Sequence, residues 1–442
     1  MKKQRLVLLL LLVSMSLAAC KPGHLGSTIL TFLRDGQLWT VDPDGANAFA
    51  IVSQGDPVIG YSWSPTHQIL AYRTLDSSFA HTAKGKSLSH QSATGLIPDL
   101  PGTINTLGVD GGTPIPIAFS NASVRYSNAQ WTPTGTRLIY RQSTVETTGN
   151  PLNNAWWISQ NDQPGGIAVK SFPDSYSIPS LSYDDRTPRL VGNDEQGIFT
   201  TTLAGTERQA LTHEALAGHP LIASLERILW RPHHQNQSYL YALPDSGSSS
   251  HSIHLILADL TGQTTVIADC TCEQFSWSPD GKAVLYRSDS TYTFVTIPET
   301  LTGHDLMSFS FSGEKEAAVY WSPDSHFLLL DGPHTLTVMN LSNHQQKIVV
   351  SDTADATTTG GAQTAQITVQ TLLQPATNNL WASDSRHLAF LTNGRTKTLA
   401  KGLYTLTVDA QGSPQDPPTL VDKGNDTQVG WSYQDPNTSF LY

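Results

Sequence analysis

The segment that decides the fold reads Trp277-Ser278-Pro279-Asp280-Gly281-Lys282-Ala283-Val284-Leu285-Tyr286. A proline presets the backbone φ angle of a turn and a glycine accepts a positive φ, so Ser-Pro-Asp-Gly predicts a tight turn. Apolar and aromatic residues dominate the flanks of this turn, which is the composition of β-strands. The segment is therefore expected to be a β-hairpin whose first strand ends near the Trp.

Four other segments repeat this pattern, and in all five a large residue follows the Trp by nine positions. These pairs are Trp63 with Tyr72, Trp131 with Tyr140, Trp277 with Tyr286, Trp321 with Leu330, and Trp381 with Phe390. Looser copies begin at Tyr183, Trp230 and Trp431, and the last is expected to run to a strand at 440–442. The turns after Trp230 and Trp431 are two residues longer, which leaves each side chain on its face of the strand. Eight aromatic anchors thus mark eight copies of one unit.

Each unit continues with a second pair of strands. An alternating strand, a polar turn with Asp or Asn and Gly, and a short outer strand follow, as in 255–259, Gly262 and 265–267. Successive anchors lie between 44 residues (Trp277 to Trp321) and 68 residues (Trp63 to Trp131) apart. Four-stranded units of about 40–50 residues are β-propeller blades, and the bulky anchors are expected to fill the seams between them.

Polar insertions account for the long intervals between anchors. Residues 76–101 interrupt the first unit and residues 351–366 extend the sixth. Because polar segments without strand patterning do not pack in a core, both are expected to be surface loops.

The two ends of the chain complement one another. Before Trp63 there is only part of a unit, with β-rich segments at 29–32, 38–45 and 49–52, and after Trp431 only the complementary part. Joined, they form one blade and close the ring, which leaves no long sheet edge exposed. The fold class is therefore all-β: one propeller of eight four-stranded blades, closed by strands from both termini, or of seven if the Tyr183 copy is not a separate sheet.

The repeat Trp-Ser-Pro-Asp-Gly-x-x-(Leu/Val)-x-Tyr, together with Leu38-Trp39-Thr40-Val41-Asp42-Pro43-Asp44-Gly45, resembles TolB-type, WD40-like (PD40) propeller repeats. The resemblance covers essentially the whole mature chain. It implies the fold more specifically than the function, because such repeats occur in periplasmic binding proteins and as the non-catalytic domain of prolyl oligopeptidase-like enzymes. The chain departs from TolB in lacking an N-terminal α/β domain, and from the peptidases in lacking a hydrolase domain.

The first twenty residues have the layout of a secretory signal. Lys2, Lys3 and Arg5 precede an apolar run, residues 6–13, that is too short to span a bilayer. Leu17-Ala18-Ala19-Cys20 resembles the lipobox of bacterial lipoproteins, which implies cleavage before Cys20 and acylation of its thiol. Two or more acyl chains anchor a protein stably. An ordinary cleaved signal with an incidental Cys is the alternative.

Three regions follow: residues 1–19 as signal peptide, 20–28 as lipidated tether, and 29–442 as propeller. We expect a monomer in the cell envelope, outside the cytoplasm and attached to the membrane by lipid. Charged residues make up only 14% of the chain and the net charge is −11, which argues against a nucleic-acid partner.

Two cysteines remain after Cys20. Cys270 and Cys272, if both lie on one strand, share a face with Cα atoms about 6.5–7 Å apart, at or beyond the usual disulfide limit. We expect buried, unpaired thiols, with a strained disulfide or a metal site as alternatives.

Motifs that carry chemistry are few, and most fit turns or strands better. Gly60-Tyr61-Ser62-Trp63-Ser64 lacks the second Gly of a nucleophile elbow. His213 and His219 are six apart, not the four of a zinc helix, and His233-His234 replace turn residues. His251 and His254 fall on opposite faces of a strand. Residues 42–47 contain only the start of a calcium loop, so a hairpin turn is expected.

Trp156 and Trp157 are neighbours on an expected strand, so their side chains should face opposite sides of the sheet. One is expected to pack between blades, and the other to make a second packing contact or to form a stacking site for a sugar or peptide.

We identify no catalytic residue, cofactor or metal site in the sequence. The favoured function is a non-catalytic binding or scaffold lipoprotein that recognises a protein, a peptide or a cell-envelope ligand through propeller loops. The alternatives are a polysaccharide lyase or glycosidase with its site at the channel mouth, and an accessory or sensor subunit of an envelope export or signalling system.

Overall fold

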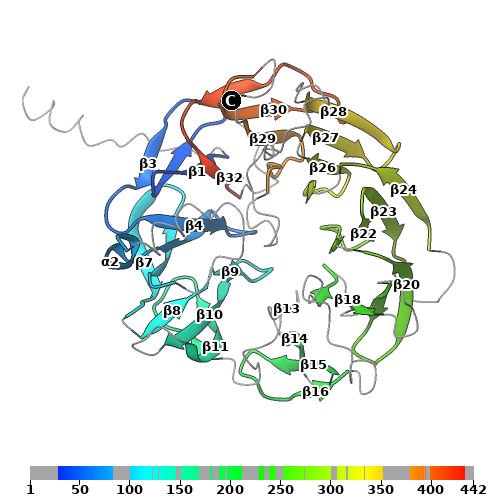
Figure 1. The fold of residues 1–442 in the computed structure, drawn as a ribbon, viewed down its shortest axis with the longest axis horizontal. Helices are drawn as coiled ribbons and strands as arrows, with labels where there is room; N and C mark the ends of the chain where they lie inside the picture. Colours follow the sequence, from blue (N-terminus) through cyan, green and yellow to red (C-terminus); the bar gives the residue numbers. More distant parts are fainter. Residues whose placement is uncertain are drawn as a thin grey trace, which may run out of the picture.

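The computed structural model is a β-propeller, with eight sheets arranged around a central axis (Figure 1). It describes residues 28–82, 100–121, 123–127, 129–145, 151–168, 180–181, 189–194, 197–211, 228–232, 238–244, 252–272, 274–299, 306–314, 317–332, 334–351, 379–392, 394 and 399–433. Cys20, Tyr183, His213, His219, His233, His234, His251 and residues 440–442 lie outside these ranges.

Blade 1 comprises β1 (Leu30–Arg34), β2 (Gln37–Val41), β3 (Phe49–Val52) and β32 (Thr427–Trp431), and blade 2 comprises β4 (Val58–Trp63), β5 (Ile69–Thr74), β6 (Ile104–Gly108) and β7 (Gly111–Ala118). Blade 3 comprises β8 (Val124–Tyr126), β9 (Gln130–Trp131), β10 (Arg137–Val145), β11 (Pro151–Gln160) and β12 (Ile167–Ala168). Blade 4 comprises β13 (Ser180–Leu181), β14 (Arg189–Asp194), β15 (Gly197–Thr202) and β16 (Gln209–Ala210).

Blade 5 comprises β17 (Leu229–Trp230), β18 (Tyr239–Pro244), β19 (Ile253–Ala258) and β20 (Thr264–Cys270), and blade 6 comprises β21 (Gln274–Trp277), β22 (Ala283–Ser288), β23 (Thr291–Thr296) and β24 (Ser308–Ser312). Blade 7 comprises β25 (Ala318–Trp321), β26 (Phe327–Asp331), β27 (Thr335–Asn340) and β28 (Gln345–Ser351). Blade 8 comprises β29 (His387–Thr392), β30 (Gly402–Thr407) and β31 (Thr419–Asp422). In blade 8 the bridge between Trp381 and Leu388 takes the innermost position.

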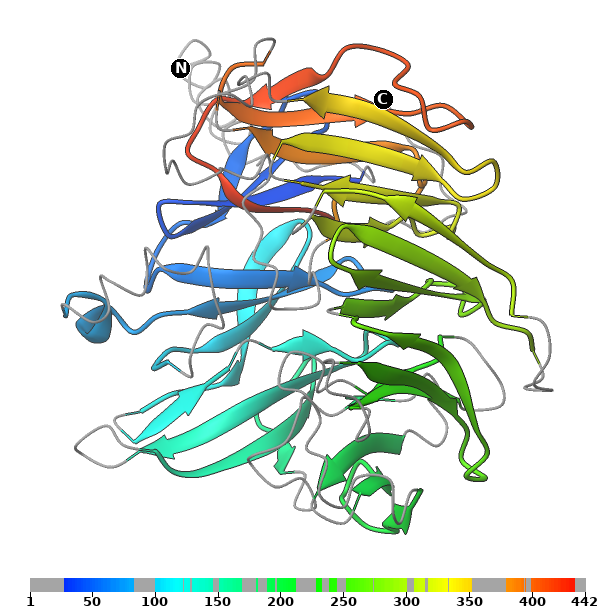
Figure 2. The ribbon, with the colours of Figure 1, turned by 45° about the vertical axis from the view of Figure 1, so that its right-hand side comes forward.

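The strands of each blade form an antiparallel meander, here lettered A to D from the axis outward. Each A strand ends near an anchor and is followed by a turn into B, as the repeat predicts. The Tyr183 copy forms its own sheet, blade 4, so the ring has eight blades and not seven. The one described helix, α2 (Ser77–Ala80), projects beyond the blades after β5 (Figure 2).

Blade 1 closes the ring with strands from both termini, as expected. Its order is β3-β2-β1-β32, with Leu30 opposite Trp431. The N-terminus supplies three strands and the C-terminus one. β1 lies beside β32 in the position that the repeat assigns to the strand after the anchor, and the predicted strand at 440–442 lies outside the described residues.

The closing contact reproduces the repeat across a chain break. In blade 6 the Ser278 hydroxyl accepts from the Ala283 amide at 2.9 Å, and the Ser278 amide donates to the Ala283 carbonyl at 2.9 Å. In blade 1 Ser432 and Ile29 make the same two bonds, at 3.0 and 2.9 Å. The chain ends thus meet in the geometry of an ordinary A–B turn.

The core lies in the seams between blades. Apolar side chains on facing sheets form separate clusters, such as one with Trp277 and Leu240 and another with Trp63 and Leu38. The indole N–H groups of six anchors also donate to the preceding blade, to Thr31, Ser62, Leu229, Ser276, Tyr320 and Leu380. Four of these acceptors are backbone carbonyls of the residue just before the preceding blade's anchor, and one of them, that of Leu380, also accepts from the Ala389 amide at 2.9 Å. The Trp anchor therefore fills the seam and adds a hydrogen bond between blades.

Candidate functional site

The two faces of the ring differ in how their strands are connected. A–B and C–D turns lie at one end of the strands, here called the turn face, and B–C and D–A connections at the other, here called the loop face. The longest turn-face connections are residues 297–307 and 408–418, whereas residues 75–103, 211–228 and 352–380 all join strand ends on the loop face. The strand ends that the long insertions join therefore all lie on one side of the ring.

Hydrogen bonds tie neighbouring turns together on the turn face. The amides of Asp280 and Asp324 donate to the hydroxyls of Ser325 and Ser385 in the next blade, at 3.1 and 2.9 Å. The guanidinium of Arg231, in blade 5, donates to the carbonyl of Gly281 in blade 6 at 2.6 Å. Gly281 has φ +69°, and a Cβ there would lie 2.2 Å from a backbone oxygen. On this face, hydrogen bonds thus link the turns of blades 5 to 8 in sequence.

On the loop face, carboxylates in D–A connections fasten the B–C turns beside them. Asp56 accepts from the Ser77 amide at 3.0 Å, and Glu314 accepts from the His334 amide at 2.9 Å. Asp426 accepts from the side chain of Arg34, which is the last residue of β1, and so fixes the start of the next B–C turn. Because these contacts lie at the roots of the connections, they fix the strand ends from which the longer segments emerge.

The densest charge cluster on this face lies where the ring closes. The Nε of Arg34 donates to Oδ1 of Asp426 at 2.8 Å, and its Nη2 pairs with Asp422. The guanidinium also lies 5.0 Å from the ring centroids of Phe32 and Trp39. The guanidinium cation therefore forms charge-assisted hydrogen bonds with the carboxylates and cation–π contacts with the aromatic rings, and both kinds of interaction are favourable. Arg34 thus joins the N-terminal strands to the segment between β31 and β32.

Asp426 is the buried member of this cluster. Its side chain has no solvent-exposed area, and its Oδ2 accepts no hydrogen bond from a donor among the described residues. Burial raises the pKa of the Asp426 carboxyl to about 6; Arg34 opposes this shift and the nearby Asp422 carboxylate adds to it. The cluster therefore takes up a proton in the mildly acidic range.

The strand motifs are structural. Ser62 and Ser64 are buried beside Trp63, and the Ser64 hydroxyl donates to the carbonyl of Gly135 in the next blade at 3.2 Å. Gly60 and Tyr61 lie in β4, with the Tyr61 hydroxyl bonded to the Thr31 carbonyl. The segment is a blade strand, as the missing Gly indicated.

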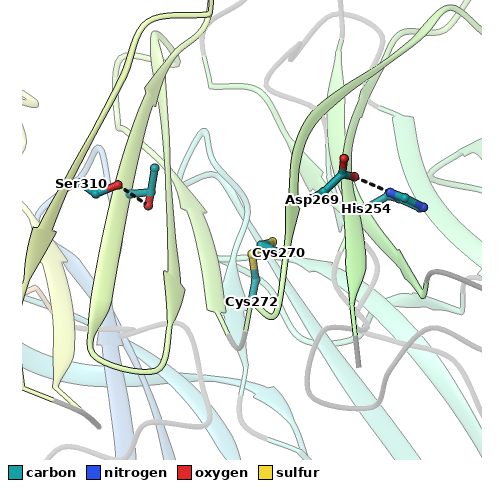
Figure 3. Close-up of a disulfide and its surroundings, with 6 residues drawn as sticks. His254, Asp269, Cys270, Cys272 and Ser310 are labelled. Atoms are coloured by element: carbon teal, nitrogen blue, oxygen red, sulfur yellow. Dashed lines mark hydrogen bonds and ion pairs between the residues drawn. A yellow bond between two sulfur atoms is a disulfide. The ribbon is translucent and has the colours of Figure 1, made fainter. Parts of the chain in front are cut away.

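The polar motifs within the described ranges also form local contacts. His254 lies on β19, with its Nδ1 2.5 Å from Oδ1 of Asp269 on β20 (Figure 3). Residues 42–47 form the hairpin turn between β2 and β3, where the Asp42 carboxylate accepts from the side-chain amide of Asn47 at 2.6 Å. No cluster of three or more His, Cys, Asp or Glu residues suited to a metal occurs in the described part of the chain.

Trp156 and Trp157 face opposite sides of blade 3, as predicted. Trp156 is buried with Leu190 and Phe199 of blade 4. Trp157 packs partly buried against the seam with blade 2, which includes Ile117. Both indoles therefore act in packing between blades, and the stacking site is not supported.

Cys270 and Cys272 form a disulfide, which corrects the expectation of unpaired thiols (Figure 3). That expectation assumed one extended strand. However, β20 ends at Cys270, so the chain turns between the two residues and brings their Cα atoms to 5.2 Å. This distance lies within the range that a disulfide requires.

The sequence reading missed Arg34, Asp422 and Asp426. A weak signal existed, since Arg34 ends a β-rich segment as Arg73 and Arg287 do, and all three side chains bond to neighbouring carbonyls or carboxylates. The carboxylate partners were not predictable, because they lie almost 400 residues away along the chain.

No protein-family model matches the chain, and no curated protein sequence matches it. Among solved structures, a eukaryotic initiation factor is 12% identical with a TM-score of 0.51, covering 93% of this chain and 100% of that chain. An oligogalacturonate lyase in complex with manganese is 13% identical, TM-score 0.46, covering 88% and 99%. A periplasmic gluconolactonase of Pseudomonas aeruginosa is 10% identical, TM-score 0.41, covering 92% and 99%. At these identities the likeness concerns the propeller fold alone.

Proposed function

We propose that this chain is a lipid-anchored, extracytoplasmic binding protein with a TolB-type propeller. It recognises a protein, a peptide or a cell-envelope component through the loop face, and it acts as a binding or scaffold module without turnover. The observation that carries the proposal is the asymmetry of the ring, in which the three longest connections, residues 75–103, 211–228 and 352–380, all join strand ends on one face. Binding residues are commonly carried on loops held by a rigid scaffold.

Two further observations support this assignment. Turns of blades 5 to 8 on the turn face bond to one another, which favours the loop face as the side that meets a ligand. The carboxylates Asp56, Glu314 and Asp426 fix the roots of the loop-face connections, so a ligand would meet ordered strand ends. The anchor rests on the lipobox at residues 17–20. No helix in the described ranges has the length and apolar character needed to cross a membrane.

The test of binding is a pull-down from native membranes with the purified protein, paired with assays on a panel of polysaccharide and lactone substrates. Replacing residues 355–375 with a short Gly-Ser linker should abolish capture of the partner. The matched control, Gln68→Ala with Lys282→Ala on the turn face, should retain it. Turnover of any panel member would favour the lyase or glycosidase alternative. Equal capture of the partner by both variants would contradict a binding site on the loop face.

The anchor is tested separately. The wild-type chain should incorporate labelled palmitate and sediment with membranes, whereas Cys20→Ser should do neither. Unlabelled wild-type protein in the soluble fraction would contradict the anchor without affecting the binding assay.

A further inference from the structure

We propose that the Cys270–Cys272 disulfide is a thiol-exchange site and not a structural crosslink. It lies in the shortest D–A connection, residues 271–273, on the loop face. The reactant that fits is a thiol, either a small one or a cysteine of a protein. The inference does not depend on the proposed ligand-binding function.

The size of the closed loop argues against a structural role. A disulfide stabilises a fold mainly by restricting the unfolded chain, and this effect grows with the number of residues enclosed. Here only Thr271 lies between the two cysteines. The linkage therefore restricts the unfolded chain very little.

The surrounding packing does not need the sulfur bond. Cys270 is the last residue of β20 and pairs with Ile253 on β19. Cys272 is buried in the seam between blades 5 and 6, in the cluster that contains Trp277 and Leu240. Strand pairing thus holds Cys270 and apolar contacts hold Cys272, so both residues are fixed by contacts other than the sulfur bond.

The two cysteine residues differ in exposure, and this difference predicts which sulfur an incoming thiolate attacks. Cys270 is only partly buried and Thr271 beside it is exposed, whereas Cys272 is 5% exposed. An incoming thiolate is expected to attack the Cys270 sulfur, because access controls which sulfur reacts. Asp269 and His254 do not assist, since neighbours on a strand face opposite sides and Asp269 is largely exposed.

The steps balance as ordinary exchange. A thiolate RS⁻ bonds to the Cys270 sulfur, the Cys270–Cys272 bond breaks, and Cys272 leaves as a thiolate that takes up a proton. A second thiolate then attacks the R sulfur, forming the disulfide RSSR and releasing Cys270 as a thiolate that is protonated in turn. The protein gains two electrons and two protons, and two thiols are oxidised to one disulfide.

The test uses the Cys20→Ser chain, in which Cys270 and Cys272 are the only cysteines. Under native conditions, glutathione should reduce the pair, measured by maleimide labelling and mass spectrometry. The oxidised and reduced forms should unfold at midpoints within a few degrees of one another. Resistance to reduction until the fold is denatured, or loss of the fold on reduction, would identify a structural crosslink and overturn the proposal.

Two single variants test which sulfur reacts. With oxidised glutathione, the Cys270 thiol left in Cys272→Ser should form a mixed disulfide at least tenfold faster than the Cys272 thiol left in Cys270→Ser. Equal rates would contradict the assignment of Cys270 as the attacked position. A parallel reaction with a small reduced dithiol protein distinguishes the source: faster reduction than by glutathione at equal thiol concentration identifies a protein cysteine as the partner, and slower reduction a small thiol.

Discussion

At the scale of single residues, the anchors combine two roles that are usually separate. Trp381 is 1% exposed, stacks on Phe327 with ring centroids 5.8 Å apart, and donates to the Tyr320 carbonyl at 3.2 Å. The equivalent carbonyl in blade 8, that of Leu380, accepts from the Ala389 amide at 2.9 Å as well as from the Trp431 indole. The indole N–H therefore adds a hydrogen bond between neighbouring blades. An aromatic residue without an N–H would fill the seam but lose this bond.

Trp381→Phe is therefore expected to lower the free energy of unfolding by about 2 kcal/mol, because a buried hydrogen bond between blades 7 and 8 and some packing are lost. The matched control is Trp156→Phe. Trp156 is similarly buried, but its indole N–H has no acceptor among the described residues, so the loss should be clearly smaller. Urea denaturation of both variants measures the difference, and equal losses would refute the role of the hydrogen bond.

Asp426 gives the chain a pH dependence of unusual sign for an aspartate. Its pKa rises from 3.8 in the unfolded chain to about 6 in the fold, so between these values the folded state binds more protons. Its contribution is fully present below pH 4 and is lost as the pH rises through 6. At 1.36 kcal/mol per pKa unit the change is at most about 3 kcal/mol.

The free energy of unfolding of the wild type, minus that of Asp426→Asn, should therefore fall between pH 4 and pH 7. Taking the difference between the variants removes the contribution of other carboxyl groups. Asp416→Asn, at an exposed position on the turn face, serves as control and should give a flat difference. A flat difference for Asp426→Asn as well would show that this carboxyl does not titrate as inferred.

At the scale of elements, the A–B turn is stabilised by side chains that accept hydrogen bonds from backbone amides within the turn. In blade 7 the Ser322 hydroxyl donates to Asp324 at 2.6 Å and accepts from the Phe327 amide at 2.9 Å. Blade 6 repeats both bonds through Ser278. In blade 8 alanine takes the serine position, and Asp384 accepts from the His387 amide in place of the missing hydroxyl. The turn thus tolerates a change in the residue that supplies the acceptor.

Ser322→Ala should lower the free energy of unfolding by about 1–2 kcal/mol, because the buried Phe327 amide loses its acceptor. Ser342→Ala, at an exposed position in the next turn of the same blade, should change it by less than about 0.5 kcal/mol. Thermal and urea denaturation provide the comparison. A Ser322→Ala protein as stable as the control would mean that water replaces the hydroxyl.

At the scale of the whole molecule, the ring is held closed by contacts between residues almost 400 positions apart. Leu30 pairs with Trp431, Ile29 bonds with Ser432, and Arg34 joins Asp422 and Asp426. Because closure satisfies the edge of β1, removing β32 exposes that edge and the seams on both sides of it. Stability of the ring therefore depends on the last described strand.

A chain that ends at Asp426 should fail to give one cooperative unfolding transition. In contrast, moving residues 427–433 ahead of Thr28 through an Asp-Gly linker should restore it. The joined sequence Ser432-Tyr433-Asp-Gly-Thr28-Ile29 matches the register of Ser278 to Ala283, whose bonds the chain ends already make. Circular dichroism during thermal unfolding tests both chains, and cooperative unfolding of the truncated chain would contradict the role of β32.

The repeat itself could be read from the sequence because its information is local. The nine-residue step from Trp to the following large residue fixes a hairpin register, and Pro and Gly fix the turn between. Eight such units, with complementary parts at the two ends, leave a closed ring as the consistent solution, which the structure confirms. The assignment of Trp156 and Trp157 to opposite faces followed from strand alternation alone.

Only the tertiary structure decided which distant residues meet. Cys270 and Cys272 form a disulfide because β20 ends at Cys270. Arg34 contacts its carboxylates because blade 1 is built from both ends of the chain. The convergence of the long connections on one face likewise depends on the order of strands within each blade. Local pattern determines each hairpin, since turn chemistry and side-chain alternation act over a few residues, whereas burial and charge pairing depend on how the hairpins are brought together around the axis.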